Sequence, residues 1–176
     1  MRGQPSEETI ERASGVFNRI LSQSDDTVMD YGLKAYALVL SLEAIIAEEV
    51  PVIDFVAIHK ARTSVRVALA REFQTKLLDR SNALTKQMHD YSGGEFIVDS
   101  KPIGQRHLRN EIFQYLDAIR DATEEQKAAA DLALNHFHFA KGMSDKKTAL
   151  LALASMVGEG KAAREQALKE LSLIHI

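Results

Sequence analysis

The chain has 176 residues and a formal charge of −3, with 45% hydrophobic, 27% charged and 6% aromatic residues. It has no cysteine, which excludes a disulfide framework, a thiolate nucleophile and any cysteine-based metal site. The small net charge gives no global attraction to nucleic acid or anionic lipid, and no apolar run is long enough to span a membrane. Residues 1–15 lack the apolar block of a secretory signal. We therefore expect one soluble domain in the cytoplasm.

Apolar residues in the first half of the chain recur at spacings of three and four, which is typical of amphipathic helices. Ser6 and Asp54 are predicted N-caps, and Pro51 ends a helix because proline disfavours the helical conformation of the residue before it. The predicted helices and their buried stripes are 6–21 (Ile10, Ala13, Phe17, Ile20), about 26–40 (Leu33, Ala37, Leu40), 42–49, and 54 to about 91 (Val65, Leu69, Phe73, Leu77).

The second half of the chain continues the same pattern. Ser92-Gly93-Gly94 ends the long helix, and residues 95–101 are predicted to form a loop with a short extended piece. Gly142 breaks the chain, and Ser144 is the predicted cap of the helix that follows. Further stripes are Leu108, Ile112, Tyr115, Leu116 and Ile119, then Ala129, Leu132, Ala133, Phe137 and Ala140, then Leu150, Leu151, Ala154 and Val157, before a last helix at 161–170.

These elements predict an all-α fold with about eight antiparallel helices and no sheet of consequence. Short connections favour a superhelical, solenoid-like array, although no repeat period is visible in the sequence.

Charge is distributed unevenly along the chain. Residues 1–53 carry four basic and nine acidic residues, whereas residues 54–90 carry seven basic and four acidic ones. The basic helix could pair with acidic neighbours or bind nucleic acid. Because no aromatic residues interleave for base stacking, we favour internal pairing and expect no nucleic-acid partner and no membrane. The basic side chains concerned are Lys60, Arg62, Arg66, Arg71 and Lys76.

Six histidines raise the possibility of a metal site. His107 and Glu111 are four residues apart and could share a helix face, as helical zinc ligands do, but no third ligand accompanies them. A hydrogen bond on the helix surface explains the pair equally well. Residues two apart on a helix point about 200° apart, so neighbouring histidines at that spacing cannot share an ion. The other histidines considered, without a second ligand on their helix face, are His59, His89, His136 and His138.

No known catalytic motif is present either. The sequence lacks His-Glu-x-x-His, Gly-x-Ser-x-Gly, a phosphate-binding loop and Gly-x-Gly-x-x-Gly. We therefore assign no catalytic, cofactor-binding or metal-binding residue in this chain.

Two segments nevertheless point to a family. Arg106-His107-Leu108-Arg109-Asn110 and residues 140–146, Ala-Lys-Gly-Met-Ser-Asp-Lys, resemble landmarks in the C-terminal helical domain of bacterial aminopeptidase N, a gluzincin zinc metallopeptidase. The family patterns are Arg-x-Leu-Arg-Asn and Ala-x-Asn-Met-Thr-Asp. This sequence has Gly142 where the family has Asn, and both residues tolerate the left-handed backbone conformation. It has Ser144 where the family has Thr, and both residues can cap a helix. The order of other features also fits the family: Gly3-Gln4-Pro5 leads into a helix, the Ile53-Asp54 boundary precedes the basic helix, and residues 164–168 match Arg-x-x-Ala-Leu. The resemblance therefore covers about residues 3–170.

The resemblance implies that residues 1–170 are a partial C-terminal helical domain. In the family, the zinc motif lies in a separate upstream thermolysin-like domain, and the helical domain covers the catalytic cleft and restricts access to it. Zinc would then be a cofactor of the parent enzyme and would not bind to this segment. The expected partners are the parent's catalytic and N-terminal domains, and peptide substrates through its cleft. No catalytic position carries over, and we expect Met1 to replace an interior start.

The last six residues, 171–176, have a different predicted origin. Leu-Ser-Leu-Ile-His-Ile is encoded by CTG-TCT-CTT-ATA-CAC-ATC, the sequence of a transposase adaptor used in library preparation. We interpret the hexapeptide as an adaptor-derived scar, the alternative being an ordinary end of the last helix.

Two functional hypotheses of different classes follow. The first is the non-catalytic helical domain of an aminopeptidase N-like enzyme, whose terminal helices should expose apolar faces where the parent buries them. The second is a stand-alone α-helical scaffold that binds a peptide or protein and has polar capping helices at both ends. A free-standing enzyme ranks third because no catalytic constellation is present.

Overall fold

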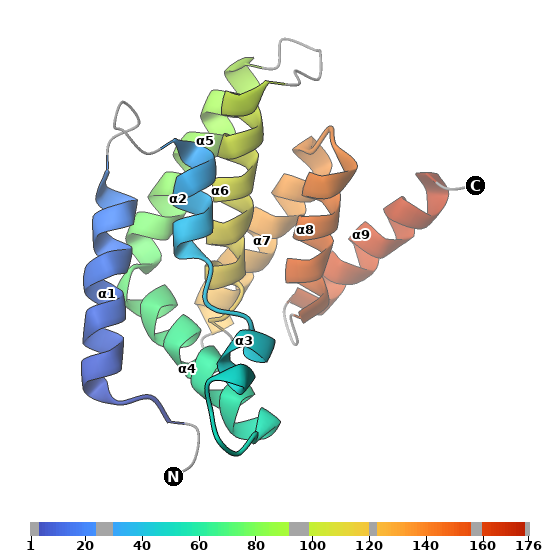
Figure 1. Ribbon diagram of the computed structural model, residues 1–176. Coiled ribbons are helices and arrows are strands. Elements are labelled where there is room, and N and C mark those ends of the chain that lie inside the picture. The colour runs from blue at the N-terminus through green and yellow to red at the C-terminus, as the bar shows by residue number, and fades with distance from the viewer. Residues whose placement is uncertain (1–3, 24–29, 92–98, 120–122, 156–159, 175–176) are drawn as a thin grey trace.

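The computed structural model describes residues 4–23, 30–91, 99–119, 123–155 and 160–174, and every regular element in these ranges is a helix (Figure 1). The predicted all-α fold class is therefore confirmed. The described part of the chain contains α1 (Glu7–Ser22), α2 (Tyr31–Leu38), α3 (Glu43–Glu48), α4 (Phe55–Glu72), α5 (Gln74–Tyr91), α6 (Ser100–Leu116), α7 (Thr123–Phe139), α8 (Met143–Ser155) and α9 (Gly160–Ile174).

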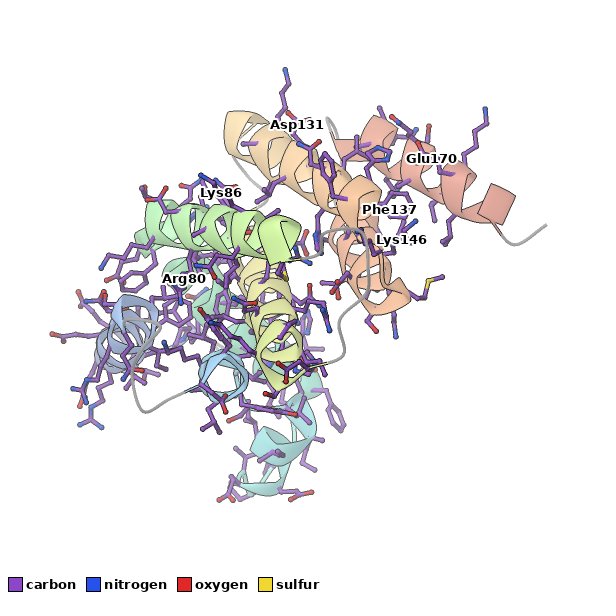
Figure 2. All side chains as sticks on the ribbon, turned by 90° about the horizontal axis from the view of Figure 1, so that it is seen from above. Arg80, Lys86, Asp131, Phe137, Lys146 and Glu170 are labelled. Atoms are coloured by element: carbon purple, nitrogen blue, oxygen red, sulfur yellow. The ribbon has the colours of Figure 1, made fainter. Side chains whose placement is uncertain are left out.

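Helix α6 lies between two groups of helices and contributes to both hydrophobic cores. Leu108, Ile112 and Tyr115 pack into a first core with α1, α2, α4 and α5. Phe113 instead joins a second core formed with α7, α8 and α9. Seen from above, α7–α9 gather on one side of α6 (Figure 2). In that group Phe137 and Lys146 point toward one another, with Nζ 5.3 Å from the ring centroid (Figure 2).

The predicted N-caps of the first and fourth helices are confirmed. The Ser6 side chain accepts a hydrogen bond from the Thr9 backbone N–H, and Asp54 accepts one from Ala57. Each cap satisfies a backbone donor that has no partner within its helix. In α1, Phe17 is buried as its stripe predicted.

The long helix predicted from 54 to 91 is wrong in one respect, because it is divided at Phe73. This residue has φ −107° and ψ 15°, and α5 begins after it. Leu69, Phe73 and Leu77 are all buried, as predicted. Residues four apart are rotated by about 400° on an ideal helix, so such a stripe drifts by about 40° at every step. The break at Phe73 divides this stripe between α4 and α5 and accounts for the additional helix.

The buried face predicted for the second helix is also wrong. Leu33 is 55% exposed and Ala37 is exposed, whereas Lys34 and Leu38 are each 2% exposed. The helix starts at Tyr31 after the capping Asp30, and residue 26 lies outside the described ranges. With eight residues, α2 has little amphipathic pattern of its own, so packing against α6 determines its inward face.

The predicted loop at 95–101 ends earlier than expected. Asp99 caps α6 at Ser100, so Lys101 is helical, and residues 92–98 lie outside the described ranges. Pro102 is accommodated in the first turn, where its missing N–H costs no helical hydrogen bond. The stripe predicted for this helix is confirmed, since its five members are buried: Leu108, Ile112, Tyr115, Leu116 and Ile119.

Two predictions for the next helices need correction. Helix α8 begins at Met143, so Ser144 lies inside its first turn and Gly142 occupies the capping position. Leu151 is 60% exposed and Ala154 is exposed, whereas the buried apolar side chains of α8 in the described ranges are Ala149, Ala152 and Leu153; Val157 lies outside these ranges. The small residues of this helix fit between α7 and α9, where a close approach excludes larger side chains. The stripe predicted for α7 agrees at Ala129, Ala133 and Phe137.

Helix α9 continues beyond the predicted end at 170 and reaches Ile174. Leu171, the first residue of the predicted scar, packs half-buried against the second core. The adaptor origin of residues 171–176 stays a prediction. None of the helices in the described ranges has both the length and the apolar character of a membrane span.

Candidate functional site

The two segments that resemble family landmarks meet in a buried polar junction. Arg109 of α6 lies with Nη2 3.5 Å from Oδ2 of Asp145 in α8, and their side chains are 6% and 7% exposed. The Asn110 side chain donates from Nδ2 to Oδ1 of the same aspartate at 3.2 Å. Residues from both segments thus share one carboxylate across 35 positions of sequence. We refer to Arg109, Asn110 and Asp145 as the α6–α8 junction.

The electrostatics of the α6–α8 junction follow from its burial. Burial lowers the pKa of Arg109 to about 10, the charge of Asp145 opposes this shift, and Arg106 reinforces it. The guanidinium therefore stays protonated at neutral pH. Asp145 lies in the first turn of α8, where the helix dipole favours a carboxylate.

His136 of α7 adds a third helix beside this junction. Its ring is 4% exposed and stacks on Phe113 with the centroids 4.9 Å apart. Burial and the positive charge of Arg109 lower its pKa to about 3, so the imidazole is neutral. Because Arg109, His136 and Asp145 are buried between α6, α7 and α8, these three side chains hold the helices together. Asn110 is half-buried and also faces the groove described next.

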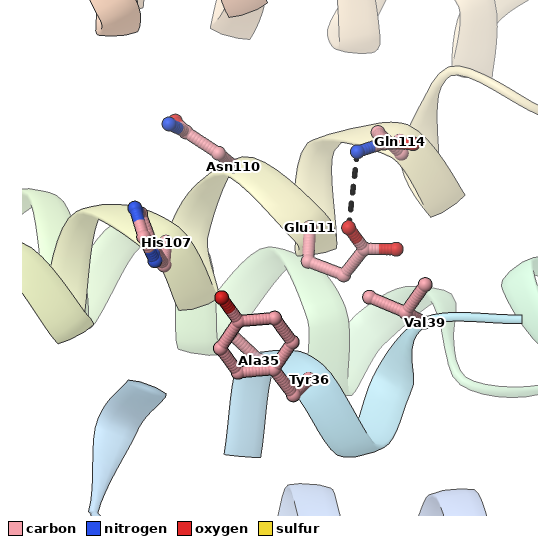
Figure 3. Close-up of a pocket in the computed structure, with 7 residues that line it drawn as sticks. All are labelled: Ala35, Tyr36, Val39, His107, Asn110, Glu111 and Gln114. Carbon is pink, nitrogen blue, oxygen red and sulfur yellow. Dashed lines mark hydrogen bonds between the residues drawn. The ribbon is translucent and has the colours of Figure 1, made fainter. Parts of the chain in front are cut away.

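An open groove lies on the outside, between α2 and α6 (Figure 3). It has a volume of about 250 Å³ and is lined by Ala35 and Tyr36 of α2, by Val39 directly after that helix, and by four polar residues of α6. The Glu111 side chain extends beside Val39 and accepts a hydrogen bond from Gln114 Nε2 to Oε2 at 3.0 Å (Figure 3). Burial raises the pKa of Glu111, and the nearby charges of Arg66 and Arg62 lower it. The four α6 residues are His107, Asn110, Glu111 and Gln114.

The structure places the histidines in separate environments. His107 and Glu111 both line the groove, but the described residues contain no group of three or more His, Asp or Glu placed to hold a metal ion. His59 Nδ1 lies 2.9 Å from Oε1 of Glu43, and His138 Nδ1 lies 3.2 Å from Oε2 of Glu170. The side chain of His89 lies outside the described part.

The basic side chains of α4 and α5 take part in intramolecular contacts. Arg62 donates to the carbonyl oxygens of Leu40 and Ser41, and Lys76 donates to Asn18 Oδ1 at 2.6 Å. The guanidinium of Arg66 lies 5.9 Å from the ring centroid of Tyr115. Internal contacts are thus observed for these three residues. These hydrogen bonds and this ring contact involve carbonyl groups, an amide and an aromatic ring, and the charges of Arg62 and Arg66 also act on the acidic Glu111, as the sequence predicts.

The sequence identified the residues of the junction but not their contact. Arg109 and Asp145 belong to the two segments that resemble the family, and nothing in either segment indicates that they pair. A chemical signal was available, because Arg109 directly follows Leu108 in a helix that is apolar on several sides. Such a charge inside a core requires a partner.

Together, the stacked helices and the buried α6–α8 junction define an all-helical domain in the described part of the chain. Residues 2–172 match the family model DUF3458_C, described as a domain of unknown function with ARM repeats. The chain therefore belongs to this family. The ARM repeats of this family agree with the solenoid-like array that the short connections between the helices predict.

Proposed function

We propose that this chain is the C-terminal helical domain of an aminopeptidase N-like zinc metallopeptidase. The parent would remove N-terminal residues from peptides with a zinc-activated water, a glutamate base and recognition of the free amine. In this enzyme the helical domain is a wall over the catalytic cleft that excludes folded proteins and water. We place the parent in the cytoplasm, in keeping with the absence of cysteine.

The observation that carries this proposal is the family match over residues 2–172. The family is found as the C-terminal domain of aminopeptidase N-like proteins. The α6–α8 junction supports it, because the residues in contact belong to the two segments through which the sequence resembles that domain.

The residues described here do not fit a zinc ion. Catalytic zinc needs three protein ligands around an open position, and His107 with Glu111 provides two. Zinc would therefore be held by the catalytic domain of the parent, and no step of its reaction is assigned to this chain.

The reading frame upstream of Met1 in the source DNA tests the proposal. We expect a His-Glu-x-x-His motif within a few hundred codons. A complete upstream frame without this motif would contradict the assignment.

A stand-alone binding scaffold is the second candidate, and one observation favours it. The first hypothesis predicts exposed apolar faces on the terminal helices. Among the side chains that the structure describes, however, α1 exposes one large apolar residue, Val16, and residues 161–172 of α9 expose one, Leu168. Ten of the sixteen exposed large apolar side chains in the described residues lie instead between Leu33 and Val56.

Hydrogen exchange distinguishes the two candidates. A domain cut from its neighbours should exchange amide hydrogens faster in α1 and α9 than in α6. Uniform protection of all helices would favour the stand-alone scaffold.

A further inference from the structure

We propose that the groove between α2 and α6 is a docking site for an arginine side chain of a protein partner whose surrounding surface is apolar. The site goes beyond the proposed function, since it does not depend on whether the parent is an aminopeptidase. The carboxylate of Glu111 and the ring of Tyr36 are the recognising groups.

The first argument is the state of Glu111. Its side chain is largely buried, and one carboxylate oxygen, Oε2, accepts from Gln114. Among the described residues, no donor is seen for the other oxygen, Oε1, and no Lys or Arg nitrogen lies within ion-pair distance of the carboxylate. The charges of Arg66 and Arg62 act on Glu111 without a direct ion pair, so the open side of the groove is where a cationic ligand can pair with this buried carboxylate directly.

The second argument is the shape of the groove. At about 250 Å³ it lies below the volumes of roughly 300–1,000 Å³ that hold drug-sized ligands, so it suits one side chain. Tyr36 is 72% exposed and forms the rim opposite the polar residues of α6 (Figure 3). A guanidinium can pair with a carboxylate and stack on an aromatic ring at once, which an ammonium group does less well.

The third argument is the surface around the groove. Leu33, Tyr36 and Val39 follow at steps of three and are each exposed by 45% or more, and the exposed apolar residues continue to Val56. A concentration of exposed large apolar side chains in one segment is typical of an interaction surface. Arginine and tyrosine are also among the residue types enriched at protein–protein hot spots, where surrounding contacts exclude water.

Charge specifies the partner further. The segment 30–56 carries five carboxylates, and its one basic residue, Lys34, is 2% exposed. Its outward charge is therefore negative. If a second copy of this chain docked through the same face, the carboxylates of the two copies would repel each other. A basic partner would instead be attracted. The five acidic residues are Asp30, Glu43, Glu48, Glu49 and Asp54.

A matched pair of peptides tests the site with the chain as it is. One is an acetylated and amidated peptide with a single arginine between leucines, and the other carries citrulline, which has the same shape without the charge. Binding is followed by NMR through the resonances of Tyr36, His107 and Glu111. We expect the arginine peptide to shift these resonances and to bind at least about tenfold more tightly than the citrulline peptide.

Three variants make the result specific. Glu111→Gln should remove the difference between the two peptides, and Tyr36→Ala, at an exposed position that does not endanger folding, should weaken binding of the arginine peptide. Glu8→Gln, which removes an exposed carboxylate of α1 outside both the groove and the acidic segment 30–56, should behave like the unchanged chain. Thermal melts monitored by circular dichroism confirm that each variant is folded.

Several outcomes would overturn the inference. These are equal binding of the two peptides, shifts confined to residues outside the groove, and an unchanged preference in Glu111→Gln. Self-association of the chain through this face, detected by sedimentation without peptide, would assign the surface to a second copy instead. None of these outcomes bears on the reading frame upstream of Met1, so the proposed function is judged separately.

Discussion

The hydroxyl group of Tyr115 in α6 donates a hydrogen bond to the backbone carbonyl oxygen of Leu38, the last residue of α2 and 77 positions earlier in the chain. The ring of Tyr115 is fully buried and meets Phe17 edge-on, with the centroids 4.7 Å apart. Burial and the nearby Glu111 raise the pKa of this hydroxyl, so it remains a donor. One side chain thereby connects α1, α2 and α6.

Replacement of Tyr115 by Phe should destabilise the chain by about 1–3 kcal/mol, because the carbonyl of Leu38 loses its buried donor. Urea unfolding monitored by circular dichroism measures the change. Tyr36→Phe is the matched control, since this ring is 72% exposed, and its stability should stay within about 0.5 kcal/mol of the unchanged chain. Equal stability of the two variants would show that the hydrogen bond contributes nothing.

Gly104→Ala should destabilise the contact between α2 and α6. A Cβ at this position would lie 2.9 Å from the backbone nitrogen of Gly32 and 3.0 Å from Cβ of Tyr31, so the helices would have to separate. We expect a net loss of about 1–3 kcal/mol in the free energy of unfolding. Gly15→Ala in α1, where nothing lies within 4 Å, should instead gain about 0.5–1 kcal/mol from helix propensity. A stabilising Gly104→Ala would contradict the close approach.

His136 should make the domain sensitive to acid. Its pKa is about 3 in the folded chain, against 6.5 for an unperturbed histidine, so below pH 6.5 the unfolded chain binds the proton more readily. The contribution of neutral His136 to the free energy of unfolding should therefore be fully present above pH 6.5 and be lost as the pH decreases toward 3. Between pH 7.5 and 5 the free energy of unfolding should fall by about 2 kcal/mol. Urea titrations at both pH values should show a smaller loss for His136→Phe. His138→Phe, at an exposed position, should retain the full loss.

The α6–α8 junction should behave as a coupled unit. Asp145→Asn leaves the buried charge of Arg109 uncompensated and should cost about 3–5 kcal/mol. The double variant Arg109→Met with Asp145→Leu should recover a large part of that loss, which a double-mutant cycle measures. Glu8→Gln, which removes the exposed pair with Arg12, should cost less than about 1 kcal/mol. Additive effects at Arg109 and Asp145 would show that the two side chains do not interact.

The purified chain should neither hydrolyse an aminoacyl-anilide nor hold stoichiometric zinc, because three ligands, a general base and an amine-binding carboxylate must meet in one cleft. Elemental analysis and a chromogenic assay measure both. Treatment with a chelator should leave the melting temperature unchanged. One zinc per chain together with turnover that survives purification would refute the assignment.

Long stripes with strong local signals were predictable from the sequence. Five members of the α6 stripe are buried as expected, and the caps at Ser6 and Asp54 form the predicted hydrogen bonds. These features depend on neighbours within a turn or two of helix, where spacing and a capping side chain suffice. Ser144 shows the limit of this reasoning, because a serine next to a glycine marks the start of a helix only to within a residue or two.

The candidate sites were only partly predictable. His107 and Glu111 were recognised as sharing one face of a helix, and both line the groove. The opposite wall comes from Tyr36 and Val39, in and directly after a helix far away in the sequence whose inward face was predicted wrongly. The ion pair of Arg109 with Asp145 likewise joins positions in different helices. Pairings of this kind depend on how helices are stacked, and spacing along one helix carries no information about that.

The sequence by itself thus determined that this chain is all helical, where most of its helices lie, and which family it resembles, because these properties follow from local spacing and short motifs. Only the tertiary structure decided which side of the short helix α2 is buried. Lys34 and Leu38 turn inward and Leu33 outward because α2 lies against α6, where Gly104 permits a close approach. An eight-residue helix gains too little from its own pattern to choose a face, so the contact with its neighbour determines it.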